Sequence, residues 1–302
     1  MVTAVLALDV GQSGTRACSS DASGVGREAD DLPALRGDGP IADQLVALVR
    51  AALDRLGPAD QVCIGCTGAE DPALATRVLA GVDVSVRRVR LAHDSVTSHL
   101  GSLGGAPGVV IAAGTGSVAL AVGRRVARVD GWGSLVGDAG SGYWIGRAAI
   151  DAVLRADDGR GEPTALTARV GERFDGVDTL GLRLQADPER VRRIAACARD
   201  VADLAERDGV AGRIADEAGR ELARTVAAGW SRAQVPSGAG VATVGQVFAG
   251  AAVAAAFARW SAELVPYGRR VEPVGDGLAG AQRLADVAPD HPLAAMVGTA
   301  TR

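Results

Sequence analysis

The sequence predicts an α/β protein built from two domains, on three observations. The chain has 302 residues, more than one hydrophobic core usually holds. Short apolar runs alternate with glycine-rich turns and longer amphipathic stretches, which is typical of strands and helices in an α/β sheet. This order of elements begins twice, near Ala4 and again at Gly108. We therefore predict an N-terminal domain over residues 1–107 and a C-terminal domain over residues 108–302, with extra helices between positions 150 and 232.

Composition excludes several classes of protein. The net charge of −4 argues against a nucleic-acid partner or an anionic membrane surface. All 32 basic residues are Arg, and the absence of Lys excludes a Walker P-loop and Schiff-base catalysis. No apolar run reaches the roughly 18 residues of a membrane span, and the first residues lack the positive charge of a secretory signal. We therefore predict a soluble, cytoplasmic chain.

The cysteines and histidines do not form a recognisable metal site. Cys63 and Cys66 make a CxxC, but they alternate with apolar residues in a stretch that we predict to be a buried strand. A second metal-type pair is absent, and the three histidines lack the spacing of zinc ligands. The four cysteines are also too few and too scattered for a disulfide framework. Packing in the core is the favoured interpretation.

The N-terminal stretch predicts two strands around a turn of glycine and hydroxyl residues. Ala4–Asp9 is a short apolar run that ends in a carboxylate, the turn Gly11–Arg16 follows, and Ala17–Ser20 forms the second strand. An Asp at the end of a first strand is well placed to hold a hydrated Mg²⁺. An Asp that only caps the turn of a hairpin fits the same residues equally well, so both interpretations stay open.

A helix and a buried strand come next. Ile41–Leu56 carries one apolar stripe and begins directly after Pro40, which favours a helix. Gln61–Cys66 is an apolar run typical of a buried strand, and it ends at Thr67 and Gly68. Polar and glycine residues thus follow the strand at its carboxyl end.

Asp94 lies where a strand is followed by a helix. A short helix that starts at residues 71–72 precedes Val84–Leu91, which alternates like a strand, and a helix runs from His93 to Gly104. Ligands bind at the carboxyl ends of strands in α/β sheets, which makes Asp94 a candidate site residue. An Asp or Ser here can also act as the N-cap of the helix, and in isolation that is the more common role.

The second half begins with a similar arrangement. Val109–Ala113 predicts a buried strand, Gly114–Ser117 forms a turn, and strands are expected over Val118–Val122 and Arg125–Val129. Glycines on either side of a threonine let backbone N–H groups come close to an anion, and the hydroxyls can add hydrogen bonds. This turn and the one over residues 9–15 could therefore bind the phosphates of one nucleotide.

A second glycine cluster follows over residues 131–142. Asp138 is flanked by glycines, where a carboxylate has no packing purpose, so a functional role is favoured. Ser141 is expected to cap the next helix. For the aromatic pair Tyr143 and Trp144, packing of the helix on the core is favoured over direct stacking on a ligand.

The remaining chain predicts helices around a late strand. The expected elements are helices over residues 188–207 and 211–232, a strand over 240–245, an Ala-rich helix to residue 263, a strand over 270–273 and a helix that opens at 277–281. The last dozen residues carry little signal.

These motifs together resemble the actin-like ATPase superfamily, and within it the BadF/BadG-type ATPase family, in particular its N-acetylglucosamine kinase branch. The resemblance runs from residue 4 to residue 285. The matching segments are DVGQSGT at 9–15, Asp94, GTGS at 114–117, GWG at 131–133, GDAGSGYWIG at 137–146 and VGQVF at 244–248.

The resemblance implies two actin-like (ribonuclease-H-like) α/β domains with a nucleotide and sugar cleft between them. It implies an ATP-dependent kinase that phosphorylates a hydroxyl of an amino sugar such as N-acetylglucosamine, usually the 6-hydroxyl, and a homodimer. Asp94 would be the general base, and Asp9 would orient Mg²⁺ through water. The residues implied for ATP are Gly11, Gln12, Ser13, Gly14, Thr15, Arg16, Thr115, Gly116, Ser117 and Gly245. Those implied for the sugar are Thr67, Gly68, Asp94, Gly131, Trp132 and Asp138.

Two departures from the family pattern concern the sugar. Ala139 stands where the family usually has Glu, and Leu32–Gly39 lacks the Asn with which bacterial members bind the sugar. Asp38 is the one side chain in that segment that could take over. Two other functions stay open. One is an ATPase that drives a partner protein. Such ATPases carry cysteines that bind a shared iron–sulfur cluster at a subunit interface. The other is a catalytically silent sugar-sensing protein.

Overall fold

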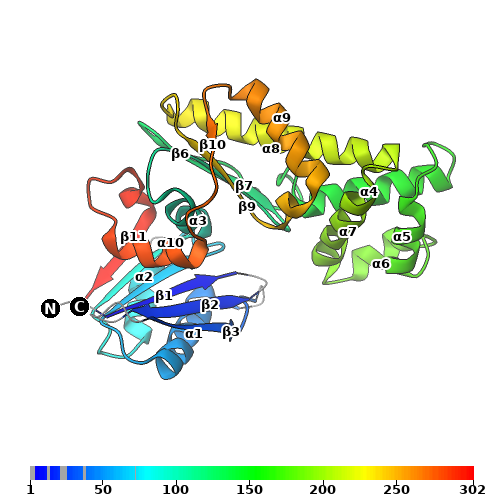
Figure 1. The fold of residues 1–302 in the computed structure, drawn as a ribbon. Coiled ribbons are helices and arrows are strands. Elements are labelled where there is room, and N and C mark those ends of the chain that lie inside the picture. Colours follow the sequence, from blue (N-terminus) through cyan, green and yellow to red (C-terminus); the bar gives the residue numbers. More distant parts are fainter. Residues whose placement is uncertain (1–3, 12–13, 21–25, 37–38, 72) are drawn as a thin grey trace. The chain divides into compact units, whose positions relative to one another are not determined.

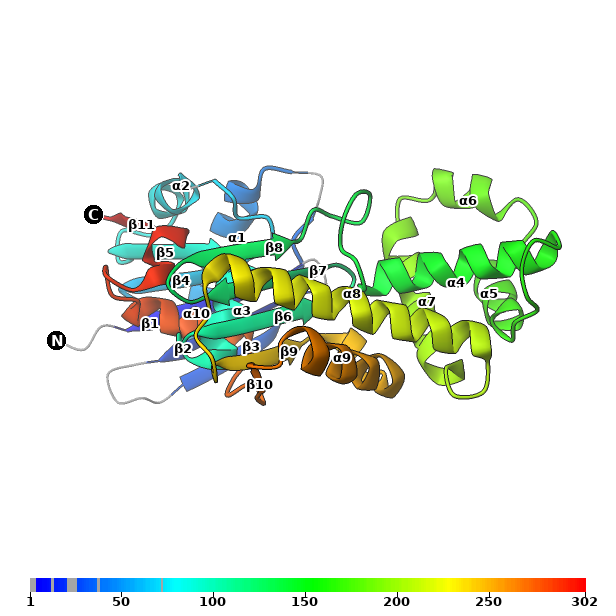
Figure 2. The same cartoon turned by 90° about the horizontal axis from the view of Figure 1, so that it is seen from above.

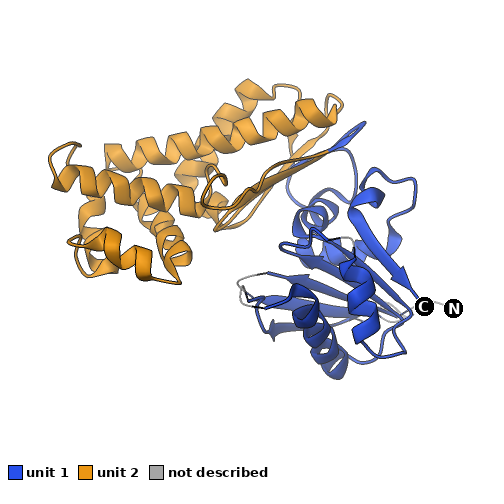
Figure 3. Ribbon diagram, turned by 180° about the vertical axis from the view of Figure 1, so that it is seen from behind, with its two compact units in different colours: residues 1–110, 122–126, 271–302 blue, residues 111–121, 127–270 orange. Residues whose placement is uncertain are grey.

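The computed structural model describes residues 4–11, 14–20, 26–36, 39–71 and 73–302 of the chain. The chain forms two compact units (Figure 3). Unit 1 comprises residues 1–110, 122–126 and 271–302, and unit 2 comprises residues 111–121 and 127–270.

Unit 1 is built on a six-stranded sheet with the strand order β11-β5-β4-β1-β2-β3 (Figure 1). The strands are β1 (Val5–Val10), β2 (Thr15–Ser20), β3 (Gly26–Leu32), β4 (Gln61–Cys66), β5 (Arg88–His93) and β11 (Val297–Thr301). β1, β4 and β5 run parallel, whereas β2, β3 and β11 pair antiparallel with their neighbours. The carboxyl ends of the three parallel strands therefore lie at one edge of the sheet.

Helices cover both faces of this sheet. They are α1 (Ile41–Leu56), α2 (Leu74–Gly81), α3 (Asp94–Leu103) and α10 (Gly277–Arg283), and the short 3₁₀ helices η2 (Leu284–Asp286) and η3 (Pro292–Met296) follow α10. In β1, Leu6, Leu8 and Val10 belong to the buried core that includes α1 and α2. Because side chains alternate along a strand, Asp9 points to the other face. There Gly277 of α10 lies so close that a Cβ on it would be 2.8 Å from Asp9 Oδ2.

The contact between α3 and α10 depends on glycines. A Cβ at Gly280 of α10 would overlap the carbonyl oxygen of Thr97, and a Cβ at Gly101 of α3 would overlap that of Asp276. The two helices therefore approach backbone to backbone, which larger residues would prevent. The C-terminal helix is thus fitted tightly to unit 1.

Unit 2 contains most of a five-stranded sheet with the order β10-β9-β6-β7-β8. The strands are β6 (Gly108–Ala113), β7 (Ser117–Val122), β8 (Val126–Asp130), β9 (Gly240–Val244) and β10 (Arg269–Arg270). The helices are α4 (Gly142–Asp157), α5 (Leu166–Phe174), α6 (Leu180–Ala186), α7 (Arg190–Leu204), α8 (Gly209–Ala233), η1 (Gln246–Ala249) and α9 (Ala251–Leu264). α8 and α9 lie side by side, and α4 packs against α7 (Figures 1 and 2).

Local pattern predicts most of these elements, and two strands differ in length. β5 starts at Arg88 rather than Val84, because Asp83 Oδ1 accepts a hydrogen bond from the Ser85 N–H (2.8 Å) and forms a turn there. The predicted strand over 270–273 is reduced to β10, which pairs with β9 through two residues.

Two further strands, β3 and β11, have no predicted counterpart. β3 (GREADDL) is polar and largely exposed at the edge of its sheet, so it lacks the alternation that would indicate a strand. β11 lies in the C-terminal stretch that carries little signal.

The place of residues 271–302 also differs from the sequence-based domain assignment. The sequence groups them with the C-terminal domain, whereas in the structure they belong to unit 1. β11 pairs with β5, and α10 packs against α3 and β1. Both contacts join segments far apart in the chain, for which a local pattern holds no information. Among the described residues, no helix combines the length and the apolar character needed to span a bilayer.

Candidate active site

In unit 1, three predicted site residues lie at the edge of the sheet where the parallel strands end. Asp9 is the next-to-last residue of β1, Thr67 follows β4 directly, and Asp94 follows β5. The order β5-β4-β1 makes these strands neighbours. Topology alone therefore collects two carboxylates and a hydroxyl at one place, as expected for a ligand site of an α/β sheet.

Asp94 is the first residue of α3, and its two carboxylate oxygens have different surroundings. Oδ2 accepts a hydrogen bond from the Thr67 hydroxyl at 2.6 Å. Oδ1 lies 2.9 Å from His93 Nδ1, but that nitrogen accepts the Ser95 N–H (3.2 Å) and caps the helix. Oδ1 is thus a buried oxygen whose polar neighbour is the His93 ring. The N-cap role that an isolated Asp would suggest belongs to His93.

The surroundings of Asp94 favour the charged form of its carboxyl group. Burial raises the pKa of its carboxyl group, while the adjacent His93 ring and the Thr67 hydroxyl lower it by more, so that the pKa lies below its ordinary value. Asp94 is therefore ionised at neutral pH.

Asp9 forms part of a network of two carboxylates and one guanidinium. Arg16 on β2 donates to Asp9 Oδ2 at 2.8 Å and to Asp276 Oδ2 at 2.6 Å. Asp276 is the N-cap of α10. It was not among the predicted site residues, and Arg16 connects it to Asp9. Burial raises the pKa of Asp9, and the charges of Asp276 and Asp94 add to this against the opposing effect of Arg16.

Asp9 is the residue of this network that could hold a divalent cation. Carboxylate oxygens are the ligands that Mg²⁺ prefers, whereas the raised pKa of Asp9 comes mainly from its burial. Within the described part of the chain, no cluster of three or more His, Cys, Asp or Glu side chains could enclose a metal. Asp9 is thus a single carboxylate that could bind such an ion.

The first glycine turn is only partly described. The Gly11 N–H donates to the Gly14 carbonyl at 3.0 Å, which closes the turn, and Gln12 and Ser13 lie outside the described residues. Thr15 is fully buried, and its hydroxyl donates to the Pro33 carbonyl at 2.7 Å. The hydroxyl of Thr15 thus holds the turn to the next segment. Asp38 is likewise outside the described residues.

In unit 2 the second turn, Gly114–Ser117, leads from β6 to β7. The Gly114 N–H donates to the Gly116 carbonyl at 2.9 Å, and Thr115 is exposed. Ser117 is buried, and its hydroxyl donates to the Ala139 carbonyl at 3.0 Å. Backbone groups and the Thr115 hydroxyl are therefore the parts of this turn that a phosphate can reach.

Asp138 lies against this turn. It is buried, and a Cβ on Gly116 would be 2.6 Å from its Oδ2, so only glycine fits there. The Gly133 N–H donates to Asp138 Oδ1 at 3.1 Å. Burial raises the pKa of Asp138, the charge of Asp130 adds to this, and backbone N–H groups oppose it. The structure thus brings the predicted residues Gly116 and Asp138 together.

Asp130, at the end of β8, was not among the predicted site residues. Its Oδ1 accepts the Asp138 N–H at 2.8 Å and its Oδ2 accepts the Ala139 N–H at 2.9 Å. An Asp directly before a Gly-Trp-Gly segment, at the end of a predicted strand, is the signal that could have identified it.

The other predicted residues of unit 2 lie near these groups in the chain or in the sheet. Trp132 is 75% exposed between Gly131 and Gly133. Gly245, at the end of β9, has a φ of 101°, and a Cβ on it would lie 2.7 Å from the carbonyl carbon of Ala113. Glycine is required there because two strand ends meet closely.

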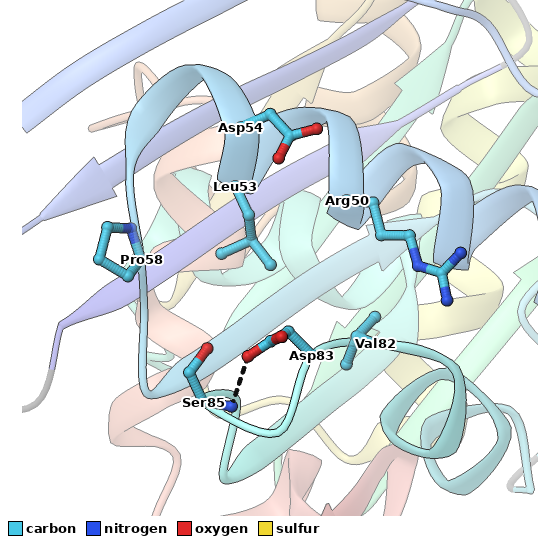
Figure 4. A pocket seen from close by; sticks show the side chains of 7 residues that line it. All are labelled: Arg50, Leu53, Asp54, Pro58, Val82, Asp83 and Ser85. Carbon is cyan, nitrogen blue, oxygen red and sulfur yellow. Dashed lines mark hydrogen bonds between the residues drawn. The ribbon is translucent and has the colours of Figure 1, made fainter.

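A surface hollow of about 570 Å³ lies elsewhere in unit 1 (Figure 4). Its lining residues come from the end of α1 and from the turns before β4 and β5: Arg50, Leu53, Asp54, Pro58, Val82, Asp83 and Ser85. These turns precede the parallel strands, whereas Asp9, Thr67 and Asp94 are at their carboxyl ends. The hollow is therefore separate from the candidate site.

Comparison with known proteins supports the kinase-like resemblance. The N-acetylmuramic acid/N-acetylglucosamine kinase of Clostridium acetobutylicum is 31% identical over 202 residues, which cover 61% of this chain and 64% of the relative. The N-acetyl-D-glucosamine kinase of Dictyostelium discoideum is 46% identical over 112 residues, 35% of each chain. The matched parts thus span less than two thirds of these relatives.

Solved structures show the same fold. A candidate N-acetylglucosamine kinase from Chromobacterium violaceum superposes with a TM-score of 0.77 at 24% identity, over 94% of this chain and 99% of that one. A ROK family glucokinase from Streptomyces griseus has a TM-score of 0.56 at 18% identity, over 94% and 99%. The fold is that of the actin-like ATPases, as predicted. Residues 7–285 match the model of the BadF/BadG/BcrA/BcrD ATPase family, and the chain belongs to this family.

Proposed function

We propose that this protein is an ATP-dependent kinase that phosphorylates a hydroxyl of an amino sugar, with N-acetylglucosamine as the first candidate and its 6-hydroxyl as the acceptor. Membership of the ATPase family and the names of both relatives support the reaction class. The predicted cleft between two domains, the homodimer and the cytoplasmic location stay predictions.

The observation that carries this proposal is the state of Asp94. A general base needs an ionised carboxylate with an oxygen that is free to accept a proton. Oδ1 is buried beside His93, whereas the Asp94 side chain as a whole is 32% exposed, so Oδ2, beside the Thr67 hydroxyl, is the oxygen that a substrate can approach. A sugar hydroxyl that donates to Oδ2 would give its proton to Asp94 as the new O–P bond forms and the bond between the γ-phosphorus and ADP breaks.

The remaining residues have supporting roles. Asp9 would hold a hydrated Mg²⁺, which neutralises charge on the phosphates when MgATP is bound. Backbone N–H groups of the turns at Gly11–Gly14 and Gly114–Ser117 would contact the phosphates, with the Thr115 hydroxyl beside them, and Gly245 would lie near the adenosine.

On the sugar side, the carboxylate of Asp138 would accept a hydrogen bond from a hydroxyl of the substrate. Gly68 and Gly131 leave backbone groups accessible because both are exposed, and Trp132 presents an exposed ring. Thr67 would act mainly by orienting Asp94, because its hydroxyl hydrogen is engaged there.

The four cysteines weigh against a partner-driven ATPase with a shared iron–sulfur cluster. All of them are free and buried, and burial raises the pKa of Cys66 to about 12 and that of Cys63 to about 11. Thiolate ligands at a subunit interface would need the opposite surroundings.

The test is ADP release from MgATP against a panel of hexoses and hexosamines. We expect turnover with an N-acetylated amino sugar, and a loss of about 10²- to 10⁴-fold in Asp94→Asn, the range typical of a general base. The matched control is Asp54→Asn, an exposed Asp on α1 at the other end of unit 1. ADP release that no sugar stimulates would indicate a partner-driven ATPase, and sugar binding without turnover would indicate a silent sensor. Either result would overturn the proposal.

A further inference from the structure

We propose that Asp130 is a positioning residue that holds Asp138 in the sugar site, by binding the backbone of the loop that carries it. This inference rests on the proposed function for its effect on the sugar, but its structural part can be tested without any substrate. Asp130 is not one of the residues assigned to the sugar.

The carboxylate of Asp130 closes the loop through both of its oxygens. Oδ1 accepts the N–H of Asp138 at 2.8 Å, and Oδ2 accepts the N–H of Ala139 at 2.9 Å. Hydrogen bonds from two consecutive N–H groups to one carboxylate fix the orientation of the peptide between them, and a charged acceptor makes each bond stronger than a neutral one would. The segment between Asp130 and Asp138 becomes a closed ring.

Backbone conformation shows what this ring requires. Asp130 has a φ of 61° and Asp138 a φ of 58°, in the left-handed region that non-glycine residues seldom adopt. Such conformations persist only where surrounding contacts hold them, and they are found most often at functional sites. The two bonds from Asp130 are contacts of that kind.

The ring is closely packed around Gly137. A Cβ at Gly137 would lie 2.7 Å from Asp130 Oδ1 and 2.6 Å from Trp132 Cβ. The Gly137 N–H donates to the Gly133 carbonyl at 2.9 Å. The carboxylate of Asp130 is therefore packed within the ring, which gives Asp138 and Trp132 defined positions relative to each other.

The ring also supplies Asp138 with a hydrogen bond of its own. The Gly133 N–H donates to Asp138 Oδ1 at 3.1 Å, and Gly133 lies in the segment that Asp130 closes. Loss of the Asp130 carboxylate would therefore release the backbone of Asp138 and also weaken the hydrogen bond from Gly133 to its side chain. The expected consequence is poorer binding of the sugar rather than slower chemistry, because Asp138 is not the base.

The experiment compares Asp130→Asn and Asp130→Gly with the wild type. Glycine accepts the positive φ without strain but offers no acceptor, and asparagine keeps one carbonyl oxygen. The first readout is hydrogen exchange at the amides of Asp138 and Ala139 in the full-length protein without ligand. We expect exchange to quicken roughly 10- to 100-fold in Asp130→Gly, as for loss of hydrogen bonds to a charged group, and less in Asp130→Asn.

The second readout is steady-state kinetics with the sugar found by the panel assay. We expect KM for the sugar to rise about 10-fold or more in Asp130→Gly with kcat changed much less, the pattern for a lost binding interaction. Asp175→Gly is the control, because Asp175 is an exposed residue at a φ of 55° beyond α5. It should leave both readouts unchanged.

The possible outcomes separate the two proposals. Unchanged exchange at Asp138 and Ala139 in both variants would overturn the role of Asp130, whatever the kinetics. Equal falls in kcat and kcat/KM with unchanged KM would overturn it as well. If the wild type phosphorylates no sugar while exchange quickens as expected, the proposed function fails and the closure of the ring by Asp130 stands.

Discussion

The polar groups of unit 1 and those of unit 2 are held in place in different ways. In unit 1, side chains bind side chains across long stretches of sequence: Arg16 joins Asp276, 260 residues away, and Thr67 joins Asp94. In unit 2, a carboxylate binds the backbone of its own loop, eight and nine residues further on in the chain. One site depends on the assembly of distant segments, and the other on a single loop.

This difference determines how a substitution should act. A change at the junctions of unit 1 disturbs several elements at once, because α10, α3 and β1 share contacts. A change in the loop or at a helix end of unit 2 removes one or two hydrogen bonds and leaves the sheet intact. Three measurements test this difference.

The largest effect is expected at the crossing of α3 and α10. Gly280→Ala would drive a methyl group into the Thr97 carbonyl, and we expect the free energy of unfolding to fall by about 3 kcal/mol, since overpacking against backbone is poorly relieved. Urea unfolding measures the loss, and hydrogen exchange should assign it to unit 1. Gly171→Ala in α5, where no atom lies within 4 Å of the added methyl, is the control and should stabilise by up to about 1 kcal/mol. Similar results for both variants would contradict the backbone contact.

An effect that depends on pH is expected at His99 of α3. This side chain is fully buried, and burial lowers its pKa from the ordinary 6.5 to about 4. Because the folded pKa is below the unfolded one, the contribution is complete above pH 6.5 and is lost as the pH falls toward 4, by about 3 kcal/mol in all. The unfolding free energy of the wild type should therefore fall relative to that of His99→Leu by about 3 kcal/mol between pH 7 and 4. Parallel curves would show that His99 takes no part.

The smallest effect is expected in unit 2, at the start of α4. Ser141 is buried, and its hydroxyl oxygen accepts the Trp144 N–H at 3.2 Å, as the sequence predicts for an N-cap. Ser141→Ala should cost about 1 kcal/mol and Ser141→Gly only a few tenths, as at other N-caps. Thermal unfolding measures both variants. A loss as large as that of Gly280→Ala would remove the distinction between the two units.

The same contrast explains what could be predicted from the sequence. The turn Gly114–Ser117 and the strand ends that carry Asp9 and Asp94 follow from local motifs and alternation, and the structure has them at these positions. Asp138 lies in the predicted glycine cluster, between β8 and α4. Asp276 and the return of β11 to unit 1 could not be predicted locally, because their partners lie far away in the chain.

A local pattern also cannot show which side-chain hydroxyls already donate a hydrogen bond within the protein. Thr15 and Ser117 fit the pattern of hydroxyls for a phosphate, but each donates to a carbonyl of another segment. Only the fold shows which hydroxyl hydrogen is already engaged. The left-handed conformation of Asp130 likewise depends on the loop around it.

Because residues 271–302 belong to unit 1, the two units cannot complete folding in the order in which they are synthesised. A growing chain emerges from the ribosome N-terminus first, and domains generally fold as units when their residues are available. Unit 2 has all its residues once position 270 has emerged, whereas unit 1 still lacks α10 and the edge strand β11. We expect the first part synthesised to be the last completed, so that a ribosome stalled before β11 leaves β5 as an open sheet edge for chaperones to cover.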